Sequence, residues 1–96
     1  HELLELYSVE SGRMIVEIKK SAEADENQQL EVLLETLRAT SANIGALAIK
    51  ETAARIIGAI DAPDTVKLTE FIQQLEAEKL RTDQEITSRC PQKTPA

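Results

Sequence analysis

The stretch ETLRAT, residues 35–40, holds the side chains whose types and spacing come closest to chemistry in this sequence. Glu35 supplies a carboxylate, Arg38 supplies a cation one helical turn later, and Thr36 and Thr40 supply hydroxyls that can accept a phosphoryl group. In a helix, however, both hydroxyls lie on a flank away from Glu35, where such side chains usually bond back to the carbonyl of the preceding turn. The pattern therefore predicts a binding face rather than a catalytic centre.

Residues that could support catalysis elsewhere in the chain stand without the partners they need. Cys90 has no histidine near it in the sequence and precedes Pro91 in a predicted tail, so we interpret it as an incidental thiol. His1, the only histidine, lies at the end of the chain, which excludes the paired Glu-x-x-His motifs of di-metal helical bundles. The glycines are too far apart to form a phosphate-binding loop. We expect no enzyme activity, no catalytic residue, no metal site and no cofactor.

The residues around Glu35 form what we call the docking face, one side of a helix expected between Asp25 and Gly45. Its members are Gln28, Glu31, Val32, Glu35, Arg38, Ala39 and Ala42. Three of them are apolar where long charged residues would favour a solvated helix. Glu31 and Glu35 are like charges four residues apart, a mildly destabilising pair that Arg38 partly offsets. An ordinary solvated helix surface is the alternative, but a low-relief patch around one acid is typical of a protein-binding surface.

Four segments repeat apolar or small residues at steps of three and four, the spacing of an amphipathic helix. In the first segment the repeating residues are Leu4, Tyr7, Ser11, Met14, Ile15, Ile18 and Ala22. In the second they are Leu30, Leu33, Leu34, Leu37, Ser41 and Ile44, which fall within about 60° of one direction. In the third, over about residues 46–60, they are Ala46, Ile49, Ala53, Ile56, Ile57 and Ile60. In the fourth they are Leu68, Phe71, Ile72 and Leu75, and the pattern thins beyond Leu80.

Local signals mark where these helices begin and end. Asp25, with Gln28 three residues later, predicts a capping box at the start of the second helix, and Gly45 ends or kinks that helix. The segment Asp61-Ala62-Pro63 predicts the start of the fourth helix, and Pro91 stops it. Because the connections are short, consecutive helices should be antiparallel neighbours.

Length and composition agree with this architecture. A chain of 96 residues holds one domain that buries about 60–65% of its unfolded surface. Few aromatics, glycines and prolines are present, which favours packed helices over a sheet with many turns. The sequence predicts an all-α, up-down four-helix bundle over residues 2–89 and a flexible C-terminal tail over residues 90–96. The abrupt start at His1 and the tail indicate a piece of a longer protein.

The net charge limits the classes of partner that this domain can bind. The net charge is −6, which repels phosphate backbones and anionic lipid, so we expect neither nucleic acid nor a membrane surface as partner. No apolar run approaches 18 residues, so we expect no membrane insertion of this domain. The single cysteine rules out an internal disulfide and fits a reducing compartment, so we expect a cytoplasmic location.

Residues 35–46 resemble the signature of histidine phosphotransfer (HPt) domains, the four-helix relay modules of bacterial two-component signalling. The family pattern is roughly His-[Ser/Thr]-Leu-Lys-Gly-x-[Ser/Ala]-x-x-[Leu/Ile]-Gly-Ala, and this chain has Glu-Thr-Leu-Arg-Ala-Thr-Ser-Ala-Asn-Ile-Gly-Ala. The match is specific at Thr36, Leu37 and residues 41–46. The surrounding helix pattern extends the resemblance over about residues 2–85.

The resemblance breaks at the residues that would carry phosphotransfer. In the family an exposed histidine carries the phosphoryl group, a lysine three residues on helps to neutralise it, and a glycine four residues on leaves room for the partner. Glu35 stands at the histidine position, Arg38 at the lysine position and Ala39 at the glycine position. Because a carboxylate cannot form phosphohistidine, the resemblance implies a degenerate HPt domain with no phosphoacceptor. Substitution at both positions 35 and 39 favours natural divergence over a single engineered change.

The resemblance then implies a non-catalytic function in phosphorelay signalling. The part of the family pattern that survives is the face that docks onto a receiver domain of a response regulator or hybrid sensor kinase. We expect the docking face and the adjoining surface of the first helix to bind such a receiver. Glu35 would project toward the acidic pocket in which a receiver holds Mg²⁺. The alternative is a structural spacer or dimerisation bundle that binds no receiver.

Overall fold

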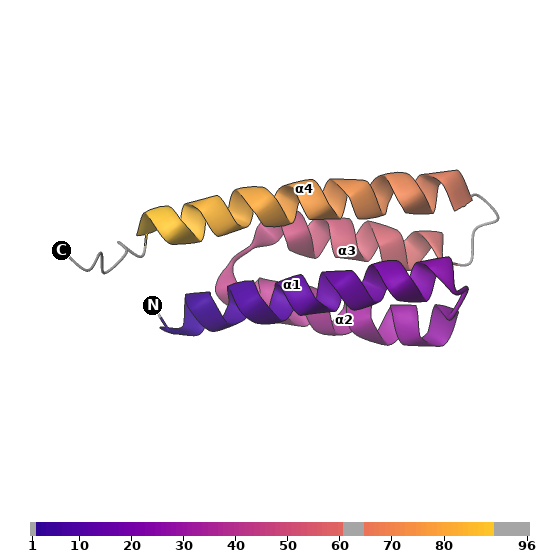
Figure 1. The fold of residues 1–96 in the computed structure, drawn as a ribbon, viewed down its shortest axis with the longest axis horizontal. Helices are drawn as coiled ribbons and strands as arrows, with labels where there is room; N and C mark the ends of the chain where they lie inside the picture. Colours follow the sequence, from indigo (N-terminus) through magenta and orange to yellow (C-terminus); the bar gives the residue numbers. More distant parts are fainter. Residues whose placement is uncertain (1, 61–64, 90–96) are drawn as a thin grey trace.

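The computed structural model describes residues 2–60 and 65–89, and these residues form an up-down bundle of four helices (Figure 1). The helices are α1 Glu2–Glu23, α2 Asn27–Ile44, α3 Leu47–Ala59 and α4 Thr65–Arg89. Each helix packs against its neighbours in the chain, and α1 also packs against α4, so the four enclose one core. Because four helices alternate in direction, α1 begins and α4 ends at the same end of the bundle (Figure 1). The predicted all-α four-helix bundle is confirmed.

Side chains from all four helices fill the core, and all but one of its buried hydrophobic members are aliphatic. Its buried members are Tyr7, Ile15, Ile18, Leu30, Leu34, Leu37, Ile49, Ala53, Ile56, Ile72, Leu75 and Ile86. The predicted stripes contain all of these residues except Ile86. Leu33 and Ile44, which were also expected in the stripe of α2, are only partly buried because they lie at its edge toward α1.

Each of α1 and α2 is followed by a residue whose backbone has a left-handed conformation. Asp25 has a φ of 56° and Gly45 a φ of 86°. After α1, the Glu26 amide donates to the Ser21 carbonyl at 2.9 Å, and the Asp25 amide donates to the Ala22 carbonyl at 3.3 Å. This pair of bonds is the Schellman motif, which satisfies carbonyls left over at a helix C-terminus. The same pattern closes α2, as expected from a glycine at that position.

The predicted capping box at Asp25 is wrong. The N-cap of α2 is Glu26, and no side chain caps the free amides of the first turn. Asp25 is instead the left-handed residue that ends α1, whereas a capping residue needs an extended backbone. Because the connection between α1 and α2 is short, Asp25 could either end α1 or cap α2. In the structure it ends α1.

The fourth helix continues well beyond Leu80, to Arg89. Ile86 returns to the core in this last stretch. The sequence pattern missed it because Lys79, Thr82 and Asp83, which precede it on the inner side, are polar. The predicted cap Asp61-Ala62-Pro63 and the predicted tail, with Cys90 and Pro91, lie outside the described residues.

Buried polar side chains pair between helices inside the bundle. The hydroxyls of Tyr7 on α1 and Ser41 on α2 hydrogen-bond to each other at 2.7 Å. On the other side, Thr52 of α3 donates to one carboxylate oxygen of Glu78 on α4, and Gln74 donates to the other oxygen at 3.2 Å. Neither Thr52 nor Glu78 belongs to a predicted stripe, because a polar residue is assigned to solvent unless a buried partner is known.

Candidate partner-docking face

The docking face lies on the outer side of α2. All seven of its residues are exposed, namely Gln28, Glu31, Val32, Glu35, Arg38, Ala39 and Ala42. The opposite side of the helix carries Leu30, Leu34 and Leu37, which are fully buried. Val32 is the largest apolar side chain on the face and is 61% exposed. The helical repeat therefore brings all seven residues onto one solvent-facing surface.

An ion pair occupies the centre of the docking face. Arg38 donates to Glu35 Oε1 from Nη2 at 2.6 Å and from Nε at 3.1 Å. Both side chains remain about half exposed, so the pair contributes only about 0.3–0.5 kcal/mol to stability. Its main consequence concerns recognition, because a partner meets a carboxylate already paired with a guanidinium and not an isolated carboxylate.

The two threonines beside Glu35 are engaged with their own helix. Thr36 Oγ1 donates to the Val32 carbonyl at 2.9 Å, and Thr40 Oγ1 donates to the Thr36 carbonyl at 2.8 Å. This back-bonding is what the sequence predicts for threonine in these positions. Both hydroxyls donate to backbone carbonyls and neither of these bonds involves a side chain that could act as a general base. These bonds therefore do not activate either threonine as a nucleophile.

A groove of about 580 Å³ runs between α1 and α2 and adjoins the docking face. Its apolar lining comes from Leu3, Leu6, Met14, Leu33 and Ile44. Leu3 is 66% and Leu6 58% exposed. Thr36 and Asn43 line the groove, and the helical repeat places them on the flank of α2 next to Val32. Exposed apolar side chains gathered beside a groove are typical of protein-binding sites.

Sequence reasoning missed Leu3 and Leu6 as members of this surface. A signal was present, because the leucines at positions 3, 4 and 6 are more than one core stripe can use. Leu4 lies in the stripe with Tyr7, whereas Leu3 and Leu6 lie beside it and point to a second apolar surface.

Tyr7 lies at the base of the groove, where its ring is buried. Burial raises the pKa of the Tyr7 phenol, and the negative charge of Asp83 raises it further, while hydrogen bonds with Ser41 and Ser11 act in the opposite direction. The phenol is therefore protonated at neutral pH. It links α1 to α2 through Ser41 and fixes the relative position of the two walls of the groove.

Residues 2–60 and 65–89 contain neither a candidate metal-binding cluster nor a candidate membrane-spanning helix. No group of three or more histidine, cysteine, aspartate or glutamate side chains in these ranges is arranged to hold a metal ion. No helix formed by these residues combines the length and hydropathy that a membrane span requires. Comparison of the chain with protein-family models, with curated proteins and with solved structures found no match.

Proposed function

We propose that this chain is a non-catalytic, HPt-like domain that binds a receiver domain of a response regulator or hybrid sensor kinase. One observation carries the proposal: α2 presents the exposed Val32 and the Glu35–Arg38 pair on its outer side, while one flank of the same helix lines an apolar groove that contains Leu3 and Leu6. The resemblance of residues 35–46 to the HPt signature supports a receiver as the partner. The carboxylate at position 35 accounts for the non-catalytic role.

The composition and the size of this surface support a protein as the partner. Specific interfaces bury about 800 Å² on each partner and combine an apolar centre with a polar rim. Here Leu3, Leu6 and Val32 supply the apolar contacts, and the charged and amide side chains of α2 supply the polar contacts. With 18 residues, α2 is roughly 27 Å long, which is the length scale of such an interface.

Binding to receiver domains tests the proposal. Purified receiver domains are titrated into the isotope-labelled chain, and amide shifts are followed by NMR. We expect shifts on the outer side of α2 and on the first turns of α1. Val32→Glu should weaken binding at least tenfold, because it places a charge at an apolar contact. Leu80→Glu is the matched control, since Leu80 is also 61% exposed but lies on α4, which is diagonally opposite α2 in the bundle.

The alternative, a spacer or dimerisation bundle, makes a different prediction for the same variants. If no receiver shifts the amides of α2 while the chain sediments as a dimer that Leu6→Glu dissociates, the groove is a self-association surface. Equal receiver binding by the parent chain, Val32→Glu and Leu80→Glu would place the interface elsewhere and refute the docking face.

Phosphoryl transfer tests the non-catalytic part of the proposal. Incubated with a phosphorylated receiver and Mg²⁺, the chain should acquire no acid-labile phosphoryl group. Glu35→His alone should accept phosphate slowly or not at all, because the Ala39 methyl group stands one turn further on the same exposed face. Glu35→His combined with Ala39→Gly should do clearly better, since a misplacement of 1 Å can slow transfer about 100-fold. Equal labelling of the single and double variants would remove the steric role of Ala39.

A further inference from the structure

The first helix carries most of the exposed apolar surface in the described part of the chain. Four of the seven large hydrophobic side chains that are exposed in residues 2–60 and 65–89 lie on α1, namely Leu3, Leu6, Val9 and Val16. Leu3 and Leu6 line the groove beside α2, whereas Val9 and Val16 do not line it. Single exposed apolar residues are ordinary, but several gathered on one helix indicate an interaction surface.

Three of these side chains belong to a regular stripe on the side of α1 that faces away from the core. We call it the outer stripe, and its members are Glu2, Leu6, Val9, Arg13, Val16 and Lys20, all of them exposed. The steps between successive members alternate between four and three residues. At about 100° per residue the six positions fall within about 80° of one direction. This is the heptad spacing through which helices pair in coiled coils.

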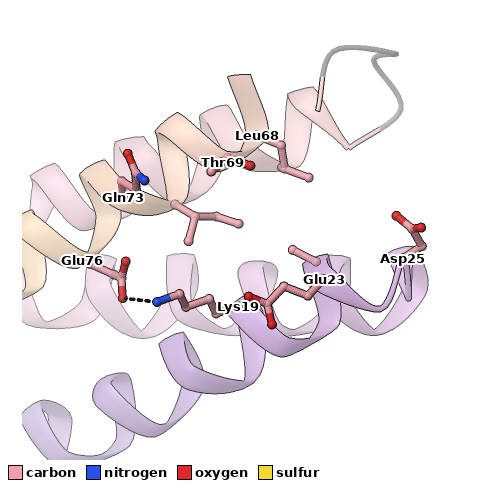
Figure 2. Close-up of a pocket in the computed structure, with 9 residues that line it drawn as sticks. Lys19, Glu23, Asp25, Leu68, Thr69, Gln73 and Glu76 are labelled. Carbon is pink, nitrogen blue, oxygen red and sulfur yellow. Dashed lines mark hydrogen bonds and ion pairs between the residues drawn. The ribbon is translucent and has the colours of Figure 1, made fainter. Parts of the chain in front are cut away.

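The charges of the outer stripe are separated along the helix. Glu2 lies at the start of α1, and the two cations, Arg13 and Lys20, lie in its second half. Lys19, next to Lys20, is instead directed toward α4, where its Nζ pairs with Glu76 Oε2 at 3.3 Å (Figure 2). Neither Glu2 nor Lys20 forms an ion pair within the residues that the structure describes. The stripe therefore presents an unpaired acid near one end and an unpaired base near the other.

We propose that the outer stripe binds a second copy of this chain, with the two α1 helices antiparallel about a two-fold axis at the level of Ser11. Members of the stripe lie at equal distances before and after Ser11, so each faces a different member of the second copy. The facing pairs are Glu2 with Lys20, Leu6 with Val16, and Val9 with Arg13. A parallel pairing would instead place Lys20 beside Lys20 and Arg13 beside Arg13, and such like-charge contacts are unfavourable.

The chemistry of the facing pairs sets the strength of this dimer. Val9 covers the aliphatic stem of Arg13, whose guanidinium keeps its bond to Glu10 of its own helix at 2.5 Å. With 22 residues, α1 is roughly 33 Å long, so one helix from each copy gives a contact smaller than a standard interface. We therefore expect a weak dimer with a dissociation constant on the order of 100 µM. The proposal does not rest on receiver binding, because Leu6 is the only apolar member of the stripe that also lines the groove.

Sedimentation equilibrium of the chain without a receiver, between about 10 µM and 1 mM, tests the proposal. We expect the fraction of dimer to rise over this range, and Val16→Glu to weaken dimerisation about tenfold or more, because it places a charge at an apolar contact. Leu3→Glu is the matched control, since Leu3 is 66% exposed on the same helix but lies outside the stripe. Leu47→Glu is a second control on α3, where Leu47 is 59% exposed. Circular dichroism checks that each variant folds.

A charge exchange tests the antiparallel register. Lys20→Glu and Glu2→Lys should each weaken the dimer about tenfold, because the two-fold axis brings like charges together at two places. The combined variant restores both opposite-charge pairs and should dimerise like the parent chain. In a parallel dimer each position meets itself, so combining the two changes would restore nothing.

Three results would overturn the proposal. They are a parent chain that is monomeric at about 1 mM, a combined charge variant no stronger than the single ones, and dissociation by Leu3→Glu but not by Val16→Glu, which would place the contact in the groove. None of them bears on the docking face, because receiver binding is read from the amides of α2 in a separate titration. Failure of receiver binding likewise leaves the sedimentation result unchanged.

Discussion

At the scale of single residues, one hydrogen bond inside the core links α1 to α2. The hydroxyls of Tyr7 and Ser41 are both removed from water and satisfy each other. Tyr7→Phe therefore leaves the Ser41 hydroxyl buried without this partner, and we expect it to lower the free energy of unfolding by about 1–2 kcal/mol. Urea denaturation followed by circular dichroism measures this loss.

A double-mutant cycle is the control for this prediction. Ser41→Ala should cost a similar amount, and the pair of substitutions should cost less than the sum, with a coupling of about 0.5–1.5 kcal/mol. Strictly additive costs would contradict the prediction and indicate that Ser41 finds another acceptor, such as a carbonyl of its own helix.

The raised pKa of Tyr7 also predicts how stability depends on pH. Its cause is burial first and the charge of Asp83 second. The unfolded chain releases the phenolic proton near the ordinary pKa of 10.0, while the folded chain still holds it. The folded state then binds more protons, so the contribution of Tyr7 is complete below pH 10.0 and is lost as the pH rises through the raised pKa.

The measurement is the free energy of unfolding between about pH 8 and pH 11 for the parent chain and for Tyr7→Phe. Above pH 10.0 the parent should lose stability more steeply than the variant, because lysine titration affects both chains equally. Parallel curves would show that the phenol has the same pKa in the folded and unfolded chain.

At the scale of helices, two glycines should respond to alanine in opposite directions. Gly45 has a φ of 86° at the end of α2, a conformation in which a Cβ is strained. Gly58 lies in the last turn of α3 with open space around the site of an added Cβ. We expect Gly45→Ala to cost about 1 kcal/mol and Gly58→Ala to gain about 0.5–1 kcal/mol in unfolding free energy. Thermal melts would refute this account if both substitutions had the same sign.

The same helices illustrate what periodicity can predict. Spacing alone identified Leu34, Ile49 and Leu75 as core residues, because a helix has one repeat and its apolar side must face inward. It could not decide the role of Asp25, since the end of α1 and the start of α2 compete for that position and both roles suit an aspartate. That competition is settled by tertiary packing, which brings the two helices to a fixed separation.

At the scale of the whole molecule, the Thr52–Glu78 contact links α3 to α4 inside a mainly aliphatic core. Thr52→Val removes one donor from a buried carboxylate that then retains Gln74, so we expect a loss of about 1–3 kcal/mol. Thr52→Val with Glu78→Leu should recover most of that loss, because a buried polar pair is often replaced by apolar residues without harm.

The measurement is urea denaturation of both variants with NMR spectra of the folded chains. A double variant less stable than Thr52→Val would show that the carboxylate stabilises the bundle beyond its bond to Thr52. Loss of dispersed resonances in the double variant alone would assign the pair a role in selecting one packing of α3 against α4.

The candidate site was predictable only in part, for a reason that belongs to this scale. The outer side of α2, with Glu35 at its centre, follows from the helical repeat of one segment. The groove with Leu3 and Leu6 depends on the rotation of α1 against α2. That rotation depends on contacts between residues far apart in the sequence, which a single helical pattern does not contain.

The ring-like order of contacts, with α1 beginning and α4 ending at one end of the bundle, has a mechanical consequence (Figure 1). A force that pulls these two ends apart separates α1 from α4 as a zipper opens, so it loads the links between them one after another. Ser8 with Asp83 comes first, and Lys19 with Glu76 follows further along. Because links that are loaded one at a time resist force less than links loaded together, α1 should separate from α4 at low tension. Single-molecule stretching from residues 2 and 89 would then show α1 and α4 separating before α2 and α3.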